Sequence, residues 1–208
     1  MSIRSKKDLE IIVSKLKSFD KPSFKLEQYP TPSNIAATWI WDMFMRGEVE
    51  NKTLLDAACG PGILGLGLLM LGAKKVIFLD KDKTALAIAK TNYNTLSEEY
   101  ELGKAEFIES DIQAFTKKVD TVVQNPPFGT KNEHIDKVFL ETAFKAAPIV
   151  YSMHKTSTAN FLKAVANDHQ FTITSMSKFN FPIKATYHFH TKPVRKVDVT
   201  LFRLEKIL

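Results

Sequence analysis

Residues 52–71 read KTLLDAACGPGILGLGLLML, and this stretch decides the fold. Lys52–Ala57 is a short apolar run that predicts a strand ending at Asp56, and Gly62–Leu71 is typical of a buried helix. The glycines between them allow a sharp turn and a close approach of the backbone to a ligand, while the following helix presents unpaired N–H groups. The stretch therefore predicts a ligand-binding loop between a strand and a helix; a tight turn that binds nothing is the alternative.

Short apolar strands alternate with helical patterns along the rest of the chain. Further strands are expected at Lys75–Asp80, Ala105–Glu109, Val119–Gln124, Pro148–Met153, Phe171–Ser177 and Val197–Leu204. Further helices are expected at Lys7–Lys17, Ser33–Arg46, Asp82–Leu96, His134–Ala147 and Ser157–Asn167. Continuous apolar strands separated by helices predict a parallel sheet that is covered on both faces. The last two strands have no helix between them, so the final strand is expected to enter antiparallel.

This order of elements predicts an α/β fold with a doubly wound, Rossmann-like sheet of seven strands, the last one antiparallel. It differs from the six parallel strands of a dinucleotide-binding fold. The 208 residues fit one domain. Within that domain, residues 1–50 are expected to form a helical segment that covers the ligand site, and residues 51–208 the Rossmann-like core.

Composition narrows the class of protein. Apolar residues make up 44% and charged residues 25% of the chain, as in soluble globular proteins. The net charge of +6 leans weakly toward a polyanionic partner. Cys59 is the single cysteine, so neither an internal disulfide nor a cysteine-based metal site can form, and no metal is expected. The charged N-terminus is unlike a signal peptide and no apolar run is long enough to span a membrane, so a cytoplasmic protein is expected.

Acidic residues follow two of the predicted strands. Asp80 lies 20 residues after Gly60 and can accept both hydroxyls of a ribose, which fits S-adenosylmethionine and a nicotinamide cofactor equally. Asp111 can accept from an adenine amine while the N–H of Ile112 serves a ring nitrogen; capping of a helix is the alternative. Residues 60–65 also match G-x-G-x-x-G, a pattern that nicotinamide and flavin enzymes share.

The sequence NPPF at residues 125–128 follows the fourth strand of the core and carries the chemistry. Two prolines fix the backbone and remove two donors, which leaves carbonyl oxygens free to face a ligand. With the side-chain oxygen of Asn125 they can accept both protons of an amine conjugated to a ring. Such bonds localise the nitrogen lone pair and stabilise the charge that develops as a methyl group arrives. Phe128 offers a face on which a base can stack.

In this fold NPPF resembles the N6-adenine and glutamine-amide methyltransferases as a group. More narrowly, the chain resembles the methyltransferase-like-five family of small-subunit ribosomal RNA N6-adenosine methyltransferases and its archaeal relatives. The matching stretches are LEQYPT at 26–31, NPPFGTK at 125–131, VYSMHK at 150–155 and the end from Tyr187 to Arg203. The resemblance spans nearly the whole chain. It implies a class I methyltransferase that uses S-adenosylmethionine to methylate N6 of an adenosine in RNA.

The resemblance also implies the residues of the site. Catalysis is expected at Asn125, Pro126, Pro127 and Phe128. The cofactor is expected to contact Gln28, Tyr29, Thr31, Asp56, Ala58, Cys59, Gly60, Pro61, Gly62, Ile63, Asp80, Lys81, Asp111, Ile112 and Asn125. One departure concerns the loop, where relatives usually carry Gly in place of Ala57 or Ala58 and where Pro61 is unusual. Relatives of this kind work with a small zinc-binding activator protein, so such a partner is implied here too.

Basic and aromatic residues mark the expected RNA contacts. They are Phe128, Lys131, His154, Lys155, His190, Lys192 and Arg195. Positive charge with interleaved aromatics suits RNA, whose phosphates give affinity and whose exposed bases stack. A solvated strand connection is the alternative for the stretch near His190. His154 can also be taken for a general base, but a histidine satisfied within the protein fits better, since the chemistry needs no general base.

Three other functions compete with RNA methylation. A protein glutamine amide fits the same acceptors, but enzymes of that kind typically carry Tyr in place of Phe128 and a larger N-terminal domain. A nicotinamide-dependent oxidoreductase would use the glycine-rich loop but leaves residues 125–128 unexplained. A silent partner that binds cofactor or RNA without turnover does not need the intact set of acceptors.

Overall fold

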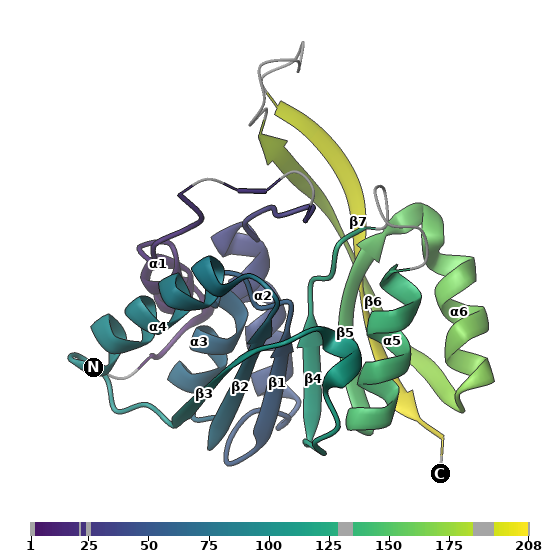
Figure 1. The fold of residues 1–208 in the computed structure, drawn as a ribbon, viewed down its shortest axis with the longest axis horizontal. Coiled ribbons are helices and arrows are strands. Elements are labelled where there is room, and N and C mark those ends of the chain that lie inside the picture. Colours follow the sequence, from purple (N-terminus) through teal and green to yellow (C-terminus); the bar gives the residue numbers. More distant parts are fainter. Residues whose placement is uncertain (1–2, 21, 24–25, 129–134, 185–193, 208) are drawn as a thin grey trace.

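A seven-stranded mixed sheet forms the centre of the protein (Figure 1). The computed structural model describes residues 3–20, 22–23, 26–128, 135–184 and 194–207. The strands are β1 Thr53–Ala57, β2 Lys75–Asp80, β3 Lys104–Glu109, β4 Thr121–Gln124, β5 Ile149–Lys155, β6 Phe171–Lys184 and β7 Val194–Lys206. Their order is β3-β2-β1-β4-β5-β7-β6, with β1 to β5 parallel and β7 antiparallel to both of its neighbours. The fold class predicted from the sequence is thereby confirmed.

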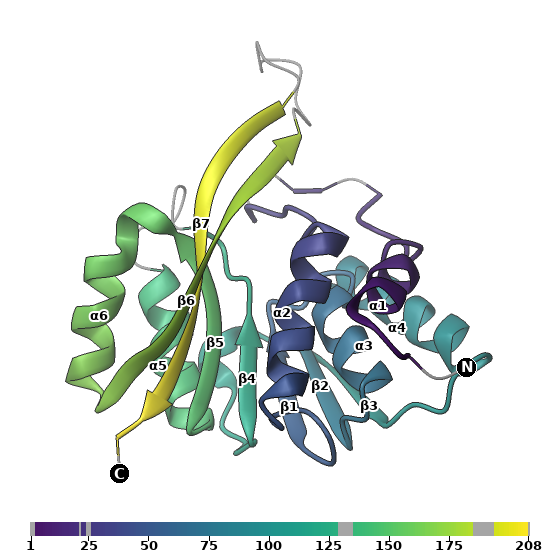
Figure 2. The same ribbon diagram turned by 180° about the vertical axis from the view of Figure 1, so that it is seen from behind.

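Helices cover both faces of this sheet (Figures 1 and 2). They are α1 Lys6–Val13, α2 Ser33–Met45, α3 Ile63–Met70, α4 Lys83–Ser97, α5 Ile135–Ala146 and α6 Ala159–Asp168, with short 3-10 turns at Ile112–Ala114 and Thr156–Thr158. Neighbouring strand residues point into separate cores. Leu54 and Val123 pack toward α1 to α4, and Leu55 and Val122 toward α5 and α6. Burial on both faces is the reason that these strands read as continuous apolar runs.

The β6–β7 hairpin is longer than the sequence predicted. β5 pairs with β7 only as far as Lys155 and Val199, whereas β6 pairs with β7 from Phe171 to Lys184. The excess length projects past the carboxyl ends of the parallel strands (Figures 1 and 2). The predicted ends of these two strands were therefore wrong, because β6 and β7 continue to pair with each other after the sheet has ended.

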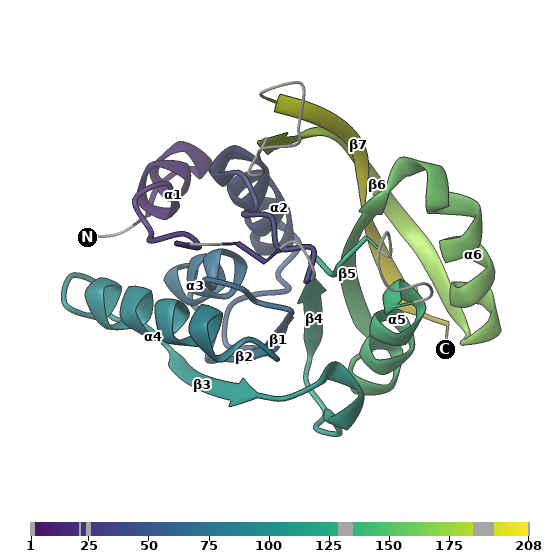
Figure 3. The ribbon, with the colours of Figure 1, turned by 45° about the horizontal axis from the view of Figure 1, so that its top comes forward.

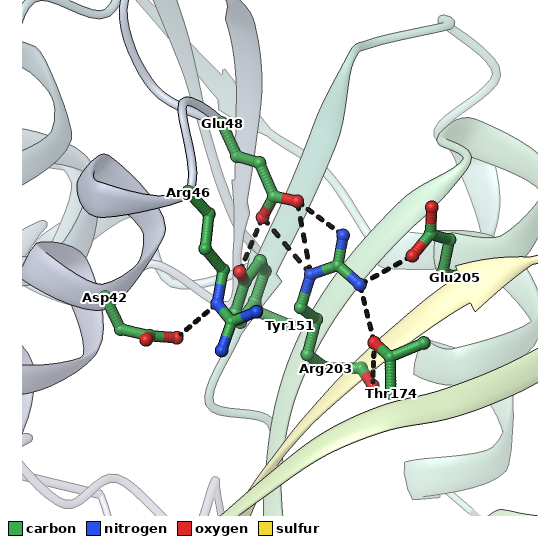
Figure 4. A network of polar contacts seen from close by, with 7 residues as sticks. All are labelled: Asp42, Arg46, Glu48, Tyr151, Thr174, Arg203 and Glu205. Atoms are coloured by element: carbon green, nitrogen blue, oxygen red, sulfur yellow. Dashed lines mark hydrogen bonds and ion pairs between the residues drawn. The ribbon is translucent and has the colours of Figure 1, made fainter.

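A buried ion pair joins the turn after α2 to β7 (Figure 4). Arg203 on β7 bonds the carboxylate of Glu48, with only 9% and 11% of the two side chains exposed. Tyr151 donates to the same carboxylate at 2.5 Å, and Arg203 also bonds Glu205 at 2.7 Å and Thr174. The network holds the turn after α2, which leads into β1, against β5 and β7.

The described part of the chain between α1 and α2 crosses above α3 toward the carboxyl end of β4 (Figure 3). It thus lies over the edge at which the parallel strands end. None of the helices in the described ranges is long and apolar enough to cross a membrane.

Candidate active site

A cavity of about 790 Å³ opens at the carboxyl ends of β1, β2 and β4. β1 lies between β2 and β4, so the direction in which strands are added reverses at this point. Ligands of open α/β sheets bind at such reversal points. Residues of the loop after β1, of the segment before α2 and of the stretch 125–128 line the walls.

Most residues predicted to contact the cofactor or to act in catalysis lie on this wall. They are Gln28, Tyr29, Thr31, Asp56, Ala58, Cys59, Gly60, Pro61, Ile63, Asp80, Lys81, Asp111, Ile112, Asn125, Pro126, Pro127 and Phe128. The exception is Gly62, which precedes α3 with a positive φ of 87°. A Cβ there would meet the Ala89 Cβ at 3.1 Å and the Phe78 ring at 3.3 Å, so Gly62 is needed for the turn and for packing.

The departure from Gly in the loop after β1 has a structural consequence. Ala58 has a φ of 54°, a left-handed conformation that glycine adopts at little cost and alanine does not. Gly60 and Gly62 also have positive φ values. The loop therefore holds some backbone strain at Ala58, on the wall of the cavity.

Asp56 contributes a buried carboxylate to the cavity. Its side chain accepts from the N–H of Gly65 at 2.8 Å through Oδ2. The other oxygen, Oδ1, is buried without a hydrogen-bond partner among the described residues. Burial raises the pKa of Asp56 to about 7. A cationic group brought close to this carboxylate would favour its charged form.

We expect the unfolding free energy of the wild type to fall relative to that of Asp56→Asn as pH rises from about 4 to about 7. In the folded protein Asp56 keeps its proton up to a pKa of about 7, whereas in the unfolded chain its pKa is about 3.9. Stability from this proton is present at low pH and lost progressively between those values. Urea unfolding across this pH range measures the free energy of unfolding. The variant Asp168→Asn, which changes an exposed carboxylate, is the control. Parallel curves for wild type and Asp56→Asn would contradict the expectation.

Asp80 and Asp111 each combine a structural contact with a position on the cavity wall. Asp80 accepts from the N–H groups of Gly60 at 2.8 Å and of Asp82 at 2.9 Å. Burial raises the pKa of Asp80, and these two N–H groups act in the opposite direction. Asp111 caps the short 3-10 turn by accepting from Gln113 at 3.0 Å. Each carboxylate keeps further lone pairs for a ligand.

Thr31 orients the side chain of Asn125. The amide nitrogen Nδ2 of Asn125 donates to Thr31 Oγ1 at 3.0 Å, which leaves Oδ1 as the acceptor that Asn125 can offer to a ligand. Pro126 and Pro127 follow, and Phe128 contacts Phe181 edge to face, with ring centroids 6.3 Å apart and planes at 88°. Because that geometry covers at most one face of Phe128, the other face remains free of Phe181.

Gln28 takes part in the packing of the N-terminal segment as well as lining the cavity. Its Nε2 donates to Asp82 Oδ2 at 2.7 Å and its Oε1 accepts from the N–H of Ser23 at 2.7 Å. The sequence predicted only a cofactor contact for Gln28. The structure adds that this side chain ties the segment before α2 to the beginning of α4.

The prediction that His154 contacts RNA is corrected by its burial. Only 2% of His154 is exposed, it does not line the cavity, and burial lowers its pKa to about 3. Its Nε2 lies 2.6 Å from the hydroxyl of Ser152, which also accepts from Gln124 at 3.0 Å. His154 is thus a neutral member of a buried hydrogen-bonded chain between β4 and β5, and cannot attract a phosphate.

Apart from Phe128, the other predicted RNA contacts lie away from the cavity wall or outside the described residues. Lys155 ends β5, is partly buried and does not line the cavity. Arg195 lies in β7, where its backbone pairs with Ile183, and its side chain is outside the described part. Lys131, His190 and Lys192 also fall outside the described residues. Contacts of these five residues with RNA stay predictions.

Sequence reasoning missed Phe19, Asn92 and Phe181. Phe19 and Phe181 line the cavity, and Asn92 bonds two segments that line it. Phe181 had a local signal, since Phe179 and Phe181 alternate with polar residues as in a strand with one buried face. Phe19 and Asn92 had none, because their partners are far away in the sequence.

Known proteins are similar to this chain in fold and in sequence. The family model described as methyltransferase small domain matches residues 40–175. The chain belongs to this methyltransferase family. It is 35% identical over 204 residues to the rRNA N(6)-adenosine-methyltransferase METTL5 of Danio rerio, an alignment that covers 95% of this chain and 97% of that protein.

Two further comparisons agree with membership of the methyltransferase small-domain family. The Drosophila melanogaster rRNA N(6)-adenosine-methyltransferase Mettl5 is 33% identical, with 95% of this chain and 94% of that protein covered. The crystal structure of a candidate RNA methyltransferase from Pyrococcus horikoshii superposes with a TM-score of 0.90 at 35% identity, covering 99% of this chain and 100% of that one. The resemblance drawn from the sequence is confirmed, and the protein is a methyltransferase.

Proposed function

We propose that this protein transfers a methyl group from S-adenosylmethionine to the N6 amine of an adenosine in RNA, in particular the RNA of the small ribosomal subunit. The observation that carries the proposal is the position of Asn125–Phe128 on the wall of the cavity, where Asn125 Oδ1 accepts from none of the described residues. The names of the animal relatives, rRNA N(6)-adenosine-methyltransferases, support RNA as the substrate.

The cavity has the groups that S-adenosylmethionine needs. Its volume of about 790 Å³ lies within the range of roughly 300–1,000 Å³ that is usual for small-molecule sites. The carboxylate of Asp56 on the cavity wall suits a cofactor that carries cationic groups. Asp80 would take the ribose hydroxyls, and Asp111 with the N–H of Ile112 the adenine. When bound, the cofactor supplies a methyl group activated by its sulfonium.

Asn125 and the carbonyl oxygens that precede the two prolines would hold the amine that is methylated. By accepting its protons they localise the nitrogen lone pair, and they stabilise the positive charge as it develops on that nitrogen. The methylated nitrogen then loses its proton readily, so no strong general base is needed. The burial of His154, whose pKa falls to about 3, is consistent with this mechanism.

Phe128 would receive the face of the target base. Stacking on an aromatic side chain is worth about 1–3 kcal/mol, which offsets much of the few kcal/mol needed to unstack the base in its RNA. Phe181 meets Phe128 edge to face and keeps that ring in place. The site therefore favours a base presented singly, outside a duplex.

Methylation of RNA can be tested directly. The purified protein is incubated with labelled S-adenosylmethionine and small-subunit ribosomal RNA that lacks the modification, and the RNA is then digested to nucleosides. We expect the label in N6-methyladenosine. A label that appears only in a protein, at a glutamine amide, would replace RNA methylation by the rival activity.

We expect removal of Arg195 and Lys196 to weaken RNA binding and to flatten its dependence on salt. Each lost phosphate contact reduces the magnitude of the negative slope of log affinity against log salt by about 0.7–0.9. Binding measured at several salt concentrations gives this slope. The control Lys145→Ala/Lys163→Ala removes the same charge from exposed positions of α5 and α6. Equal slopes in wild type and the Arg195/Lys196 variant would assign these residues to solvent.

We also propose a small zinc-binding activator protein as a partner, as the resemblance implies. Co-expression followed by size-exclusion chromatography would test it, and a methylation rate unchanged by the activator would remove it from the mechanism.

A further inference from the structure

Asn92 on α4 joins two segments of the cavity wall without lying on that wall. Only 3% of the residue is exposed. Its Oδ1 accepts from the N–H of Lys17 at 2.9 Å, and its Nδ2 donates to the carbonyl oxygens of Lys17 at 2.9 Å and of Pro61 at 3.0 Å. Both donors of the amide and one of its acceptor sites are therefore used.

The two segments are residues 14–20, here called the strap, and the loop after β1 that contains Pro61. Both line the cavity. Asn92 holds the strap by the N–H and the carbonyl of the same residue, Lys17, which fixes the position and the direction of its backbone. The third bond holds the loop at Pro61. One buried side chain thus sets the separation of strap and loop.

The strap also packs closely against the loop after β1 next to these bonds, which leaves both segments little freedom to move. A Cβ placed on Gly60 would lie 2.8 Å from Cζ of Phe19, so the Phe19 ring of the strap packs directly on the backbone of the loop. Asp82, which caps α4, accepts from Gln28 farther along the N-terminal segment. Of the described residues, none in α4 lines the cavity. Asn92 of α4 nevertheless holds the strap, and Asp82 at its N-cap holds Gln28, so this helix fixes the N-terminal segment over the cavity at two places.

We propose that Asn92 is a positioning residue for the cofactor: it holds strap and loop together so that they close over S-adenosylmethionine. The inference rests on the cofactor of the proposed function but not on the identity of the methylated group. Loss of these bonds opens the cover and speeds dissociation of the cofactor. The groups that hold the reacting amine, at 125–128, are untouched, so transfer from bound cofactor keeps its rate.

Two variants test this at Asn92. Asn92→Ala removes all three bonds, and Asn92→Asp keeps the size but sets oxygens against the carbonyls of Lys17 and Pro61. We expect calorimetry to show that both bind S-adenosylmethionine tenfold or more weakly. The rate of single-turnover methylation at saturating cofactor should stay within about twofold of the wild type, because the transition-state contacts are intact. RNA affinity should not change.

A matched control comes from the neighbouring residue of the same helix. Thr91 is exposed and its hydroxyl bonds only the carbonyl of Ala87 in α4 among the described contacts, so Thr91→Ala should bind the cofactor like the wild type. Phe19→Leu weakens the same cover from the strap side, and should speed cofactor dissociation even where an Asn92 variant fails to fold.

The outcomes separate this inference from the proposed function. Folded Asn92 variants with wild-type cofactor affinity would overturn the inference, as would a lost transfer rate with affinity unchanged. If the Asn92 variants fail to fold, wild-type cofactor dissociation from Phe19→Leu overturns it. A wild-type protein that binds S-adenosylmethionine but leaves RNA unmethylated would overturn the proposed function and leave the role of Asn92 standing. A wild type that binds none would overturn both.

Discussion

Asn125→Ala is expected to lower the rate of single-turnover methylation by about a hundredfold or more, by analogy with the loss of one oxyanion-hole donor. The reason is that the oxygen of Asn125 accepts from the amine more strongly as the nitrogen becomes tetrahedral and positive. A group of this kind lowers the barrier more than it helps binding. Cofactor affinity should therefore change little.

The contact between Asn125 and Thr31 guides the design of this experiment. Nδ2 of Asn125 donates to Thr31 Oγ1 at 3.0 Å, so alanine at 125 also frees that hydroxyl. Phe128→Ala is a comparison in the same segment, and should impair RNA capture as well as rate because base stacking is lost. Saturating cofactor and a titration of RNA separate the two effects. A near-normal rate of Asn125→Ala on the true substrate would disprove the mechanism in which residues 125–128 hold the amine that is methylated.

The core of the fold could be predicted because its central strands β1, β2, β4 and β5 are buried on both faces. Lys75–Asp80 was predicted to the residue, and the loop after β1 carries glycines where the backbone needs positive φ. Such patterns are local, so the sequence displays them. The antiparallel last strand followed from the sequence, in which no helical pattern separates the last two predicted strands.

The ends of β6 and β7 could not be predicted in this way. Residues 194–198 of β7 pair only with β6, because β5 ends at the level of Val199. The apolar alternation that marks a buried strand therefore involves fewer residues there. The exposed Lys178 and Asn180 alternate with Phe179 and Phe181, which is a strand signal too short to show where the hairpin ends. Pairing between strands, rather than local composition, sets the length of the hairpin.

Residues of the candidate site divide in the same way. Asp56, Asp80 and Asn125 lie at or next to the carboxyl ends of strands. These ends of parallel strands meet at one edge of the sheet, so the convergence of the three residues on one cavity could be predicted. Asn92 lies 75 residues from its partner Lys17, and no short pattern encodes that contact. His154 was expected to contact RNA, with a satisfied histidine as the alternative, because Thr200 of β7, its partner across the sheet, comes much later in the chain.

Arg203→Met is expected to lower the free energy of unfolding by about 3–5 kcal/mol, the usual effect of breaking a buried ion pair from one side. Arg203 and Glu48 are only 9% and 11% exposed. Methionine fills much of the space of arginine but leaves the carboxylate of Glu48 with Tyr151 as its remaining partner in the network, 2.5 Å away (Figure 4). The cost is therefore the desolvation of a charge that has lost its counterion. Urea unfolding with linear extrapolation measures it.

Two further variants show whether burial is the cause. Arg46 and Asp42 form an ion pair at 2.9 Å with side chains 39% and 45% exposed, so Arg46→Ala should cost little, less than about 1 kcal/mol. The double variant Glu48→Gln/Arg203→Met removes both charges, and replacing both members of a buried pair is often close to neutral. It should be more stable than Arg203→Met alone. If the double variant is the less stable of the two, the uncompensated charge of Glu48 is not what destabilises the single variant, and lost packing around Arg203 accounts for the effect instead.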